Sequence, residues 1–230
     1  VIAGAPFFDA GETDEGRAFV YHGAASGLSA APAWNAESDQ ASAQLGISVA
    51  TAGDVNGDGY SDVIAGAPGF AAGEAGEGRA LVYQGSAAGL SAAPAWTAES
   101  NQAGAQLGIS VATVGDVNGD GFSDAIAGAN LFDAGETDEG RAFVYHGSAA
   151  GLSTGAAWTS ESNQASALFA YSAAAGGDVN GDGYSDVIAG APFFDAGETD
   201  EGRTFVYHGS AAGLSTAPSW TAESNQYVAL

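Results

Sequence analysis

The chain has 230 residues, 46% of them hydrophobic, so its length alone allows one or two domains with a buried core. Its 28 acidic residues face only 4 basic ones, which gives a formal net charge of −24. This charge, without any basic patch, excludes nucleic acid and anionic membrane surfaces as partners. The chain has no cysteine, so disulfides say nothing about its redox compartment. No stretch approaches the about 20 apolar residues of a membrane helix, so we expect no membrane insertion.

A fixed period of 62 residues runs through the whole chain. VIAGAP at residues 1–6 returns at 63–68 and 187–192, and as AIAGAN at 125–130. A constant period of this size is typical of a solenoid, a propeller or an array. The basic residues and the tryptophans keep the same step: Arg17, Arg79, Arg141, Arg203, Trp34, Trp96, Trp158 and Trp220.

Each full period predicts four short β-strands, which in the first full period lie at residues 45–53, 63–67, 79–84 and 93–98. Clusters of Gly, Ser and Pro separate them and break both helix and sheet. Four short strands per unit are typical of a propeller blade. We therefore predict an all-β chain, a single β-propeller or part of one, built from blades of four antiparallel strands. In chain order, we expect a partial blade without its inner strand at residues 1–44 and complete blades at 45–106, 107–168 and 169–230.

A nine-residue acidic loop occurs three times, as DVNGDGYSD at residues 54–62 and 178–186 and as DVNGDGFSD at 116–124. Its positions 1, 3, 5 and 9 carry oxygen-bearing side chains, and glycine at position 6 permits a sharp turn. Ca²⁺ takes about six to eight oxygen ligands, which these side chains and the backbone carbonyl of residue 7 supply in sequence order. We therefore predict one Ca²⁺ per loop. The predicted ligands are Asp54, Asn56, Asp58, Tyr60, Asp62, Asp116, Asn118, Asp120, Phe122, Asp124, Asp178, Asn180, Asp182, Tyr184 and Asp186.

Two other interpretations of this loop exist. The same residue types favour plain solvated turns, but three matches at every ligand position favour the metal site. An EF-hand fits poorly, because its bidentate Glu at position 12 is replaced by Ala65, Ala127 and Ala189. Apolar, strand-like residues follow each loop directly, so we expect the loop to join two strands.

Two further motifs flank the acidic loop. Leu-Gly precedes it at residues 45–46 and 107–108, with Phe-Ala at 169–170, and Gly-Ala-Pro follows it at 66–68 and 190–192. With these motifs the chain resembles the FG-GAP repeat family, the blades of integrin α-subunit propellers and their bacterial relatives. The resemblance covers nearly the whole chain, and the acidic loop occupies the family's calcium position. Ala170 in place of the FG glycine and Asn130 in place of the GAP proline depart from the pattern, which leaves the blade geometry there open.

FG-GAP propellers resemble seven-bladed rings, and the predicted blades make up just over half of such a ring. An open stack would leave unpaired backbone groups at both ends, which is a template for association. Three explanations stay open. The chain is a fragment of a longer polypeptide, which the absence of methionine favours, or it closes a ring with a second copy of itself, or it forms a four-bladed ring that tolerates a missing inner strand.

The sequence carries little that favours catalysis. His22, His146 and His208 share one repeat position with Gln84, so we expect them to be surface residues. The acidic hairpin at residues 9–15 is either a solvated tip or an acid–base pair or second cation site. The four tryptophans either pack against neighbouring blades or form a sugar-stacking platform. The near-identity of the repeats argues against an enzyme, because a catalytic centre usually needs residues that break the repeat.

The resemblance implies a calcium-stabilised, non-enzymatic module for adhesion or assembly, which binds a protein or glycan ligand or further copies of itself. The alternatives are a lectin-like, carbohydrate-binding propeller and an accessory propeller of a longer secreted hydrolase. Because extracellular calcium modules bind at about 10⁻⁴–10⁻³ M, we expect the chain to be secreted or at the cell surface.

Overall fold

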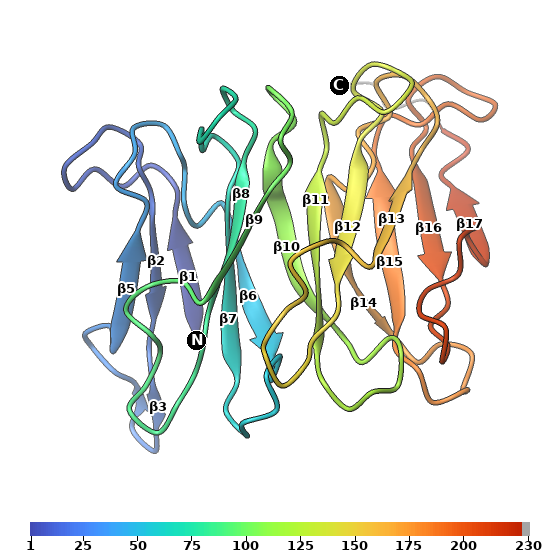
Figure 1. Cartoon of the computed structure of the whole chain (residues 1–230). Coiled ribbons are helices and arrows are strands. Elements are labelled where there is room, and N and C mark those ends of the chain that lie inside the picture. Colours follow the sequence, from blue (N-terminus) through green and yellow to red (C-terminus); the bar gives the residue numbers. More distant parts are fainter. Residues whose placement is uncertain (227–230) are drawn as a thin grey trace.

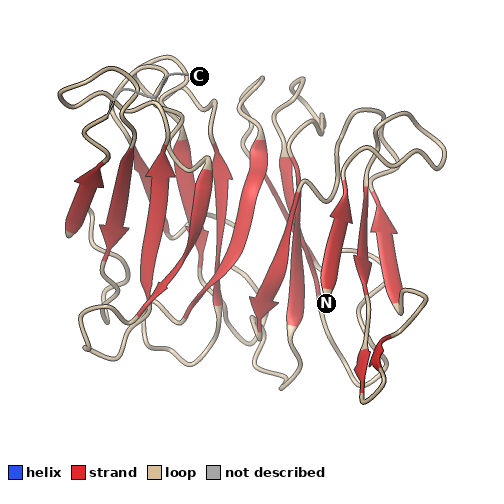
Figure 2. Cartoon of the chain, turned by 180° about the vertical axis from the view of Figure 1, so that it is seen from behind, coloured by secondary structure: helices blue, strands red, loops and turns tan. Residues whose placement is uncertain are grey.

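A computed structural model describes residues 1–226 and shows an all-β chain whose sheets stand side by side in sequence order (Figures 1 and 2). Three sheets have four strands each and the first has three, all paired antiparallel. The described part of the chain contains no helix that would be long and apolar enough to cross a membrane. The fold class predicted from the 62-residue repeat is therefore confirmed.

The strand bounds follow the repeat. The first sheet contains β1 (Ile2–Ala5), β2 (Arg17–Val20) and β5 (Trp34–Glu37), and a small hairpin lies between the last two, formed by β3 (Gly23–Ala24) and β4 (Gly27–Leu28). The second sheet contains β6 (Ser48–Gly53), β7 (Asp62–Ala67), β8 (Arg79–Tyr83) and β9 (Trp96–Glu99). The third contains β10 (Leu107–Gly115), β11 (Asp124–Ala129), β12 (Arg141–Tyr145) and β13 (Trp158–Glu161). The fourth contains β14 (Ser172–Gly177), β15 (Asp186–Ala191), β16 (Arg203–Tyr207) and β17 (Trp220–Glu223).

The observed strands differ from the predicted ones mainly at their first residues. β6 begins at Ser48 rather than at residue 45. In the next sheet β10 spans the full equivalent range, Leu107–Gly115, with a register shift between Leu107 and Ser110. β9 begins at Trp96, two residues after Pro94, which has no N–H to give to a strand ladder. The hairpin β3–β4 was not predicted.

Apolar residues lie between successive sheets in three clusters. The second strand of the middle sheets is buried along its whole length, because sheets cover both of its faces. This explains its continuous run of small and apolar residues, DVIAGA in β7 and DAIAGA in β11, since a strand buried on both faces does not alternate.

The glycine of the GAP motif allows the backbones of adjacent sheets to approach closely. A Cβ added at Gly66 would lie 1.8 Å from the carbonyl oxygen of Gly108, and one at Gly128 would lie 2.2 Å from that of Ala170. Ala170 adopts a φ of +62°, in the left-handed region that a glycine occupies at the other FG positions. The departure at Ala170 therefore leaves the approach in place. Asn130 is buried, with 4% of its surface exposed, and its Oδ1 has no hydrogen-bond partner among the described residues.

The sheet formed by residues of the first 44 has three strands, β1, β2 and β5, and within the described residues β1 pairs only with β2. The described residues therefore contain no strand next to β1 that corresponds to β6, β10 and β14, the first strands of the other sheets. The exact blade boundaries and the closure of a ring stay predictions.

Candidate metal-binding loops

The three acidic loops link the first and second strands of their sheets, β6 to β7, β10 to β11 and β14 to β15. Because the connection is the same in each sheet, all three loops lie at one end of the stack, the lower one in Figure 1. The sequence thus places three equivalent acidic loops on one side of the molecule.

Hydrogen bonds inside the first loop hold its carboxylates in place. Asp54 Oδ1 accepts the N–H of Gly57 at 2.7 Å, and Asp54 Oδ2 accepts that of Gly59 at 2.8 Å. The Oδ1 atoms of Asn56 and Asp58 each accept the N–H two residues further on, at 3.1 and 2.9 Å. Gly57 and Gly59 have φ values of +72° and +87°, which close the turn around these oxygens. The oxygens of positions 1, 3 and 5 are therefore held by N–H groups of one turn.

Asp62 closes the base of the first loop. Its side chain is fully buried, and its two oxygens accept the N–H groups of Val55 at 2.9 Å and Gly85 at 2.8 Å. Burial raises the pKa of Asp62 above its ordinary value, against these N–H donors, and the carboxylates of Asp58 and Asp54 add to the rise. The loop thus holds negative charge that the protein itself compensates only in part.

A divalent cation fits this arrangement. Each carboxylate oxygen that accepts one N–H still has a free lone pair for a hard cation, and the crowding of Asp54, Asp58 and Asp62 favours positive charge. In residues 1–226, no three His, Cys, Asp or Glu side chains gather as a metal cage by themselves, so a bound ion would also need Asn56 Oδ1 and the carbonyl of Tyr60. Calcium binding at these residues stays a prediction.

The second and third loops repeat the same hydrogen bonds. The first aspartates accept the N–H groups of Gly121 and Gly183 at 2.8 and 2.9 Å, as Asp54 does for Gly59. The other hydrogen bonds of the first loop also recur in these two loops. They involve Asp116, Asn118, Asp120, Phe122, Asp124, Asp178, Asn180, Asp182, Tyr184 and Asp186.

One contact breaks this symmetry between the loops. His146 is only partly exposed, and its Nδ1 lies 3.3 Å from the Asn118 amide nitrogen. The other two histidine side chains make no hydrogen bond within residues 1–226; His22 is exposed, and His208 is partly exposed, as His146 is. The expectation of surface histidines is confirmed for His22, whereas the Nε2 atom of His146 is buried. The repeat position of His146 gave no signal of its contact with Asn118.

The carboxylates of the acidic hairpins serve the fold. Glu15 is 1% exposed, and its Oε1 accepts the N–H groups of Ala10 at 2.7 Å and Gly11 at 3.1 Å. In each sheet the arginine of the second-to-last strand pairs with a glutamate of the outer strand and lies over a phenylalanine ring, as Arg79 does with Glu99 and Phe70. The sequence did not reveal the burial of Glu15 and its equivalents in the other hairpins, because their hydrogen-bond partners are backbone groups.

Three of the four tryptophans pack between sheets. The indole of Trp34 meets the ring of Tyr83 edge to face, with 4.7 Å between centroids, and its Nε1 donates to the carbonyl of Ser91 at 3.0 Å. Trp96 and Trp158 repeat both contacts. Trp220 is 54% exposed. Of the two expectations for the tryptophans, packing is confirmed for three of them.

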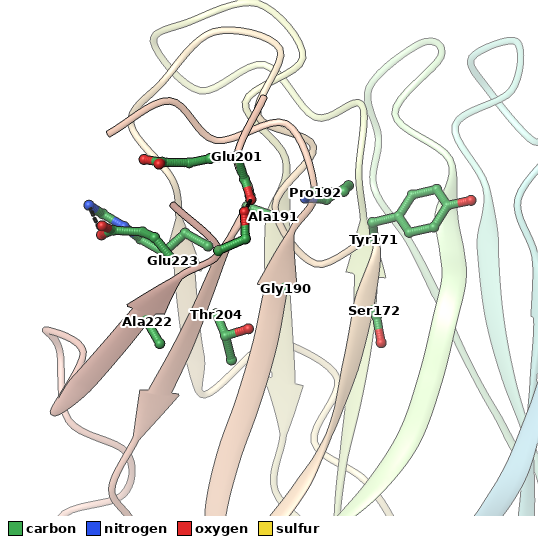
Figure 3. A pocket seen from close by; sticks show the side chains of 12 residues that line it. Tyr171, Ser172, Gly190, Ala191, Pro192, Glu201, Thr204, Ala222 and Glu223 are labelled. Carbon is green, nitrogen blue, oxygen red and sulfur yellow. Dashed lines mark hydrogen bonds and ion pairs between the residues drawn. The ribbon is translucent and has the colours of Figure 1, made fainter. Parts of the chain in front are cut away.

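A pocket of about 420 Å³ lies on the last sheet (Figure 3). Its carboxylates, Glu201 and Glu223, are both engaged: Glu201 accepts the N–H groups of Ala196 and Gly197, and Glu223 pairs with Arg203. The Tyr171 side chain projects away from them. Because these carboxylates serve the hairpin and the ion pair, the pocket offers no acid–base pair for catalysis.

The fold defines a class of repeat protein, built from stacked four-stranded sheets with an acidic loop after each first strand. Comparison with known sequences identifies the family. The family model described as "FG-GAP repeat" matches residues 45–83, 107–145 and 169–207. The chain belongs to the FG-GAP repeat family.

Curated relatives carry the name integrin alpha. The chain is 34% identical to integrin alpha pat-2 of Caenorhabditis briggsae over 79% of its own length, and 31% identical to integrin alpha-5 of Xenopus laevis over 80%. Integrin alpha-PS2 of Drosophila melanogaster is 33% identical over 80%. The matches cover only 15%, 18% and 13% of these relatives, so the chain corresponds to a small part of each.

Proposed function

We propose that this chain is a calcium-stabilised interaction module, without catalytic activity, that works outside the cell or at the cell surface. The observation that carries the proposal is the threefold acidic loop, whose Asp54, Asn56 and Asp58 oxygens accept N–H groups within one tight turn. Membership of a family whose relatives are named integrin alpha supports an adhesive role.

The shape of the loops favours calcium as a stabiliser of the fold rather than as a reagent. Asp62, Asp124 and Asp186 are each fully buried at the base of a loop and bond to the turn after the third strand of the same sheet. An ion bound to such an aspartate would link the loop to that turn. The ligands would then hold three strands of a sheet together at one end.

The partner we propose is a protein that binds the end of the stack where the three acidic loops lie. It would bind through basic groups or through shared cations. The net charge of −24 favours such a partner electrostatically. A sugar platform of stacked tryptophans is disfavoured, because Trp34, Trp96 and Trp158 pack against tyrosine rings of the next sheet and donate their Nε1–H groups to backbone carbonyls.

The proposal is tested by immobilising the chain and probing it with extracellular-matrix proteins, with cell surfaces and with a glycan array, in millimolar calcium and in chelator. We expect saturable protein binding that chelator abolishes. A matched variant with Asp58→Asn, Asp120→Asn and Asp182→Asn should lose the binding, while Asp133→Asn, in an exposed hairpin, should keep it. Binding to glycans alone would replace the proposal by the lectin, and protein binding that ignores both chelator and the loop variant would overturn it.

A further inference from the structure

The three acidic loops contact one another in sequence order along one end of the stack. The second loop meets the first through the two residues that precede its buried aspartate. The N–H of Ser123 donates to the Asp54 carbonyl at 3.0 Å, and the Ser123 hydroxyl accepts the N–H of Asp54 at 3.2 Å. The ring of Phe122 lies against Gly57, where an added Cβ would meet it at 2.6 Å. A predicted ligand of the first loop is thus bonded directly to the second loop.

A turn of the third sheet holds the same two loops together. Gly147 donates its N–H to Asp124 Oδ1 of the second loop at 2.8 Å. Its neighbour Ser148 donates to the Val55 carbonyl of the first loop at 3.1 Å. The packing is tight, since a Cβ added at Gly147 would lie 2.4 Å from the Ser123 carbonyl oxygen and 2.9 Å from that of Val55. A displacement of either loop therefore disturbs the other.

The second and third loops make the equivalent contacts. The N–H of Ser185 donates to the Asp116 carbonyl at 3.0 Å. The ring of Tyr184 lies against Gly119, 2.5 Å from where an added Cβ would stand. The turn at residues 209–210 bonds to both loops, as its counterpart in the third sheet does. The middle loop therefore takes part in both junctions.

Ordering each loop carries a free-energy cost that an ordered neighbour can reduce. Gly57 and Gly59 are exposed and have φ values of +72° and +87°, and fixing glycine in one conformation is entropically unfavourable. The carboxylates of Asp54, Asp58 and Asp62 repel one another when no cation lies between them. An ion that orders one loop also fixes the groups that its neighbour contacts, so the next ion binds a loop that is already partly ordered.

We infer that neighbouring acidic loops bind calcium cooperatively, through the main-chain and ring contacts that join them. This inference rests on the proposed calcium function and adds its regulation. An ion in the middle loop, residues 116–124, raises the affinity of the loops at 54–62 and 178–186, and each of these raises its affinity by the same factor, because linkage is reciprocal. Within residues 1–226 the first and third loops share no hydrogen bond with each other, so their direct coupling is small.

Charge alone predicts the opposite result, which makes the two causes separable. The middle loop contains three aspartates, so it carries one negative charge with a divalent ion bound, whereas an empty Asp120→Asn loop carries two. By Coulomb attraction, the more negative empty loop would favour cations in the neighbouring loops. Weaker binding beside an empty middle loop would therefore come from the contacts between loops.

The test is a calcium titration of the full chain and of its Asp120→Asn variant, followed by NMR at the amides of Gly59, Gly121 and Gly183. These N–H groups donate to the first aspartate of their loops, so each reports the occupancy of its own loop. In Asp120→Asn, at an exposed position, we expect the calcium midpoints at Gly59 and Gly183 to rise at least about fivefold. In Asp182→Asn the midpoint should rise at Gly121 and much less at Gly59.

Two charge-neutral variants, Phe122→Ala and Tyr184→Ala, separate the two junctions and serve as controls for each other. Both side chains are partly exposed, and each residue supplies only its main-chain carbonyl to the predicted calcium site. Phe122→Ala should raise the calcium midpoint at Gly59 more than at Gly183, because it weakens the contact between the first and second loops. Tyr184→Ala should do the reverse.

The outcomes distinguish the coupling from the calcium function on which it rests. In a wild type that binds calcium, midpoints at Gly59 and Gly183 that are unchanged or lowered in Asp120→Asn would overturn the coupling and leave the calcium function standing. Equal effects of Phe122→Ala and Tyr184→Ala at both glycines would overturn the part assigned to the contacts. No calcium binding at any loop of the wild type would contradict the proposed function and the coupling together.

Discussion

Asp124 lies fully buried at the base of the second acidic loop and accepts the N–H groups of Val117 at 2.9 Å and Gly147 at 2.8 Å. These bonds join the loop to the turn after the third strand. The sequence identified Asp124 as a candidate ligand from its spacing, but not its two backbone partners, because one of them lies 23 residues away. The residue therefore serves the fold whether or not an ion is bound.

Asp124→Asn should destabilise the protein even in chelator, because the amide nitrogen of Asn would face a backbone donor. We expect a loss of about 1–3 kcal/mol in the free energy of unfolding, measured by urea denaturation without metal. Asp120→Asn, at an exposed loop position, should change it by less than about 0.5 kcal/mol. Equal effects of the two variants in chelator would contradict the structural role of Asp124.

The ionisation of Glu77 makes the stability of the fold depend on pH in the acid range. Burial opposes its ionised form, but the N–H groups of Gly73, Ala72 and Glu74, with the charge of Arg79, outweigh burial and lower the pKa of Glu77 below its ordinary 4.5. A lowered folded pKa contributes stability that is fully present above the ordinary value and is lost as the pH falls through the folded value.

Glu77→Gln should therefore cost about 1–3 kcal/mol at neutral pH, and the difference from the wild type should shrink as the pH falls below 4.5. Denaturation curves across this pH range measure it. Glu74→Gln, an exposed neighbour, is the matched control and should follow the wild type at every pH. A Glu77→Gln difference that is constant down to strong acid would show that ionisation plays no part.

At the scale of elements, the close approach of adjacent sheets depends on the glycine of the GAP motif. Gly66→Ala should destabilise the chain by at least about 1–3 kcal/mol, as in an overpacked core, because the new Cβ would meet the Gly108 carbonyl oxygen at 1.8 Å. Gly190→Ala is the matched control, since its added Cβ has only the Ser172 carbonyl at 3.8 Å nearby.

Thermal and urea unfolding of both variants would measure the difference. If Gly190→Ala proved as costly as Gly66→Ala, the glycine would act through its own strand rather than through the neighbouring sheet.

The elements were predictable where the sequence signal is periodic, and less so where contacts are long-range. Asp, Asn and Gly at fixed spacing revealed the loops, and the apolar VIAGA runs revealed the second strands. The first strand was predicted too long in the second sheet, where β6 begins at Ser48, but its equivalent in the third sheet, β10, begins at Leu107 and fills the predicted range. The contact of His146 with Asn118 had no local signal, since the two residues lie 28 positions apart in the sequence. The burial of Glu15 was missed for another reason: its partners, Ala10 and Gly11, bind it through their backbone N–H groups, which no side chain reveals.

At the scale of the whole molecule, the proposed ions should decide how stable the stack is. At free calcium ten to a hundred times the Kd, each ion stabilises the fold by about 1.4–2.7 kcal/mol. For a chain of this size, three ions should raise the melting temperature by roughly 10 °C or more. Calorimetry in calcium and in chelator measures the shift, and a melting temperature unchanged by chelator would contradict it.

The most direct test is a native mass spectrum of the chain in millimolar calcium, which counts bound ions on each molecule. We predict three Ca²⁺ per chain, one for each acidic loop, and none on the variant with Asp58→Asn, Asp120→Asn and Asp182→Asn. A chain that retains no calcium, or a variant that retains as much as the wild type, would contradict the assignment of the loops as calcium sites.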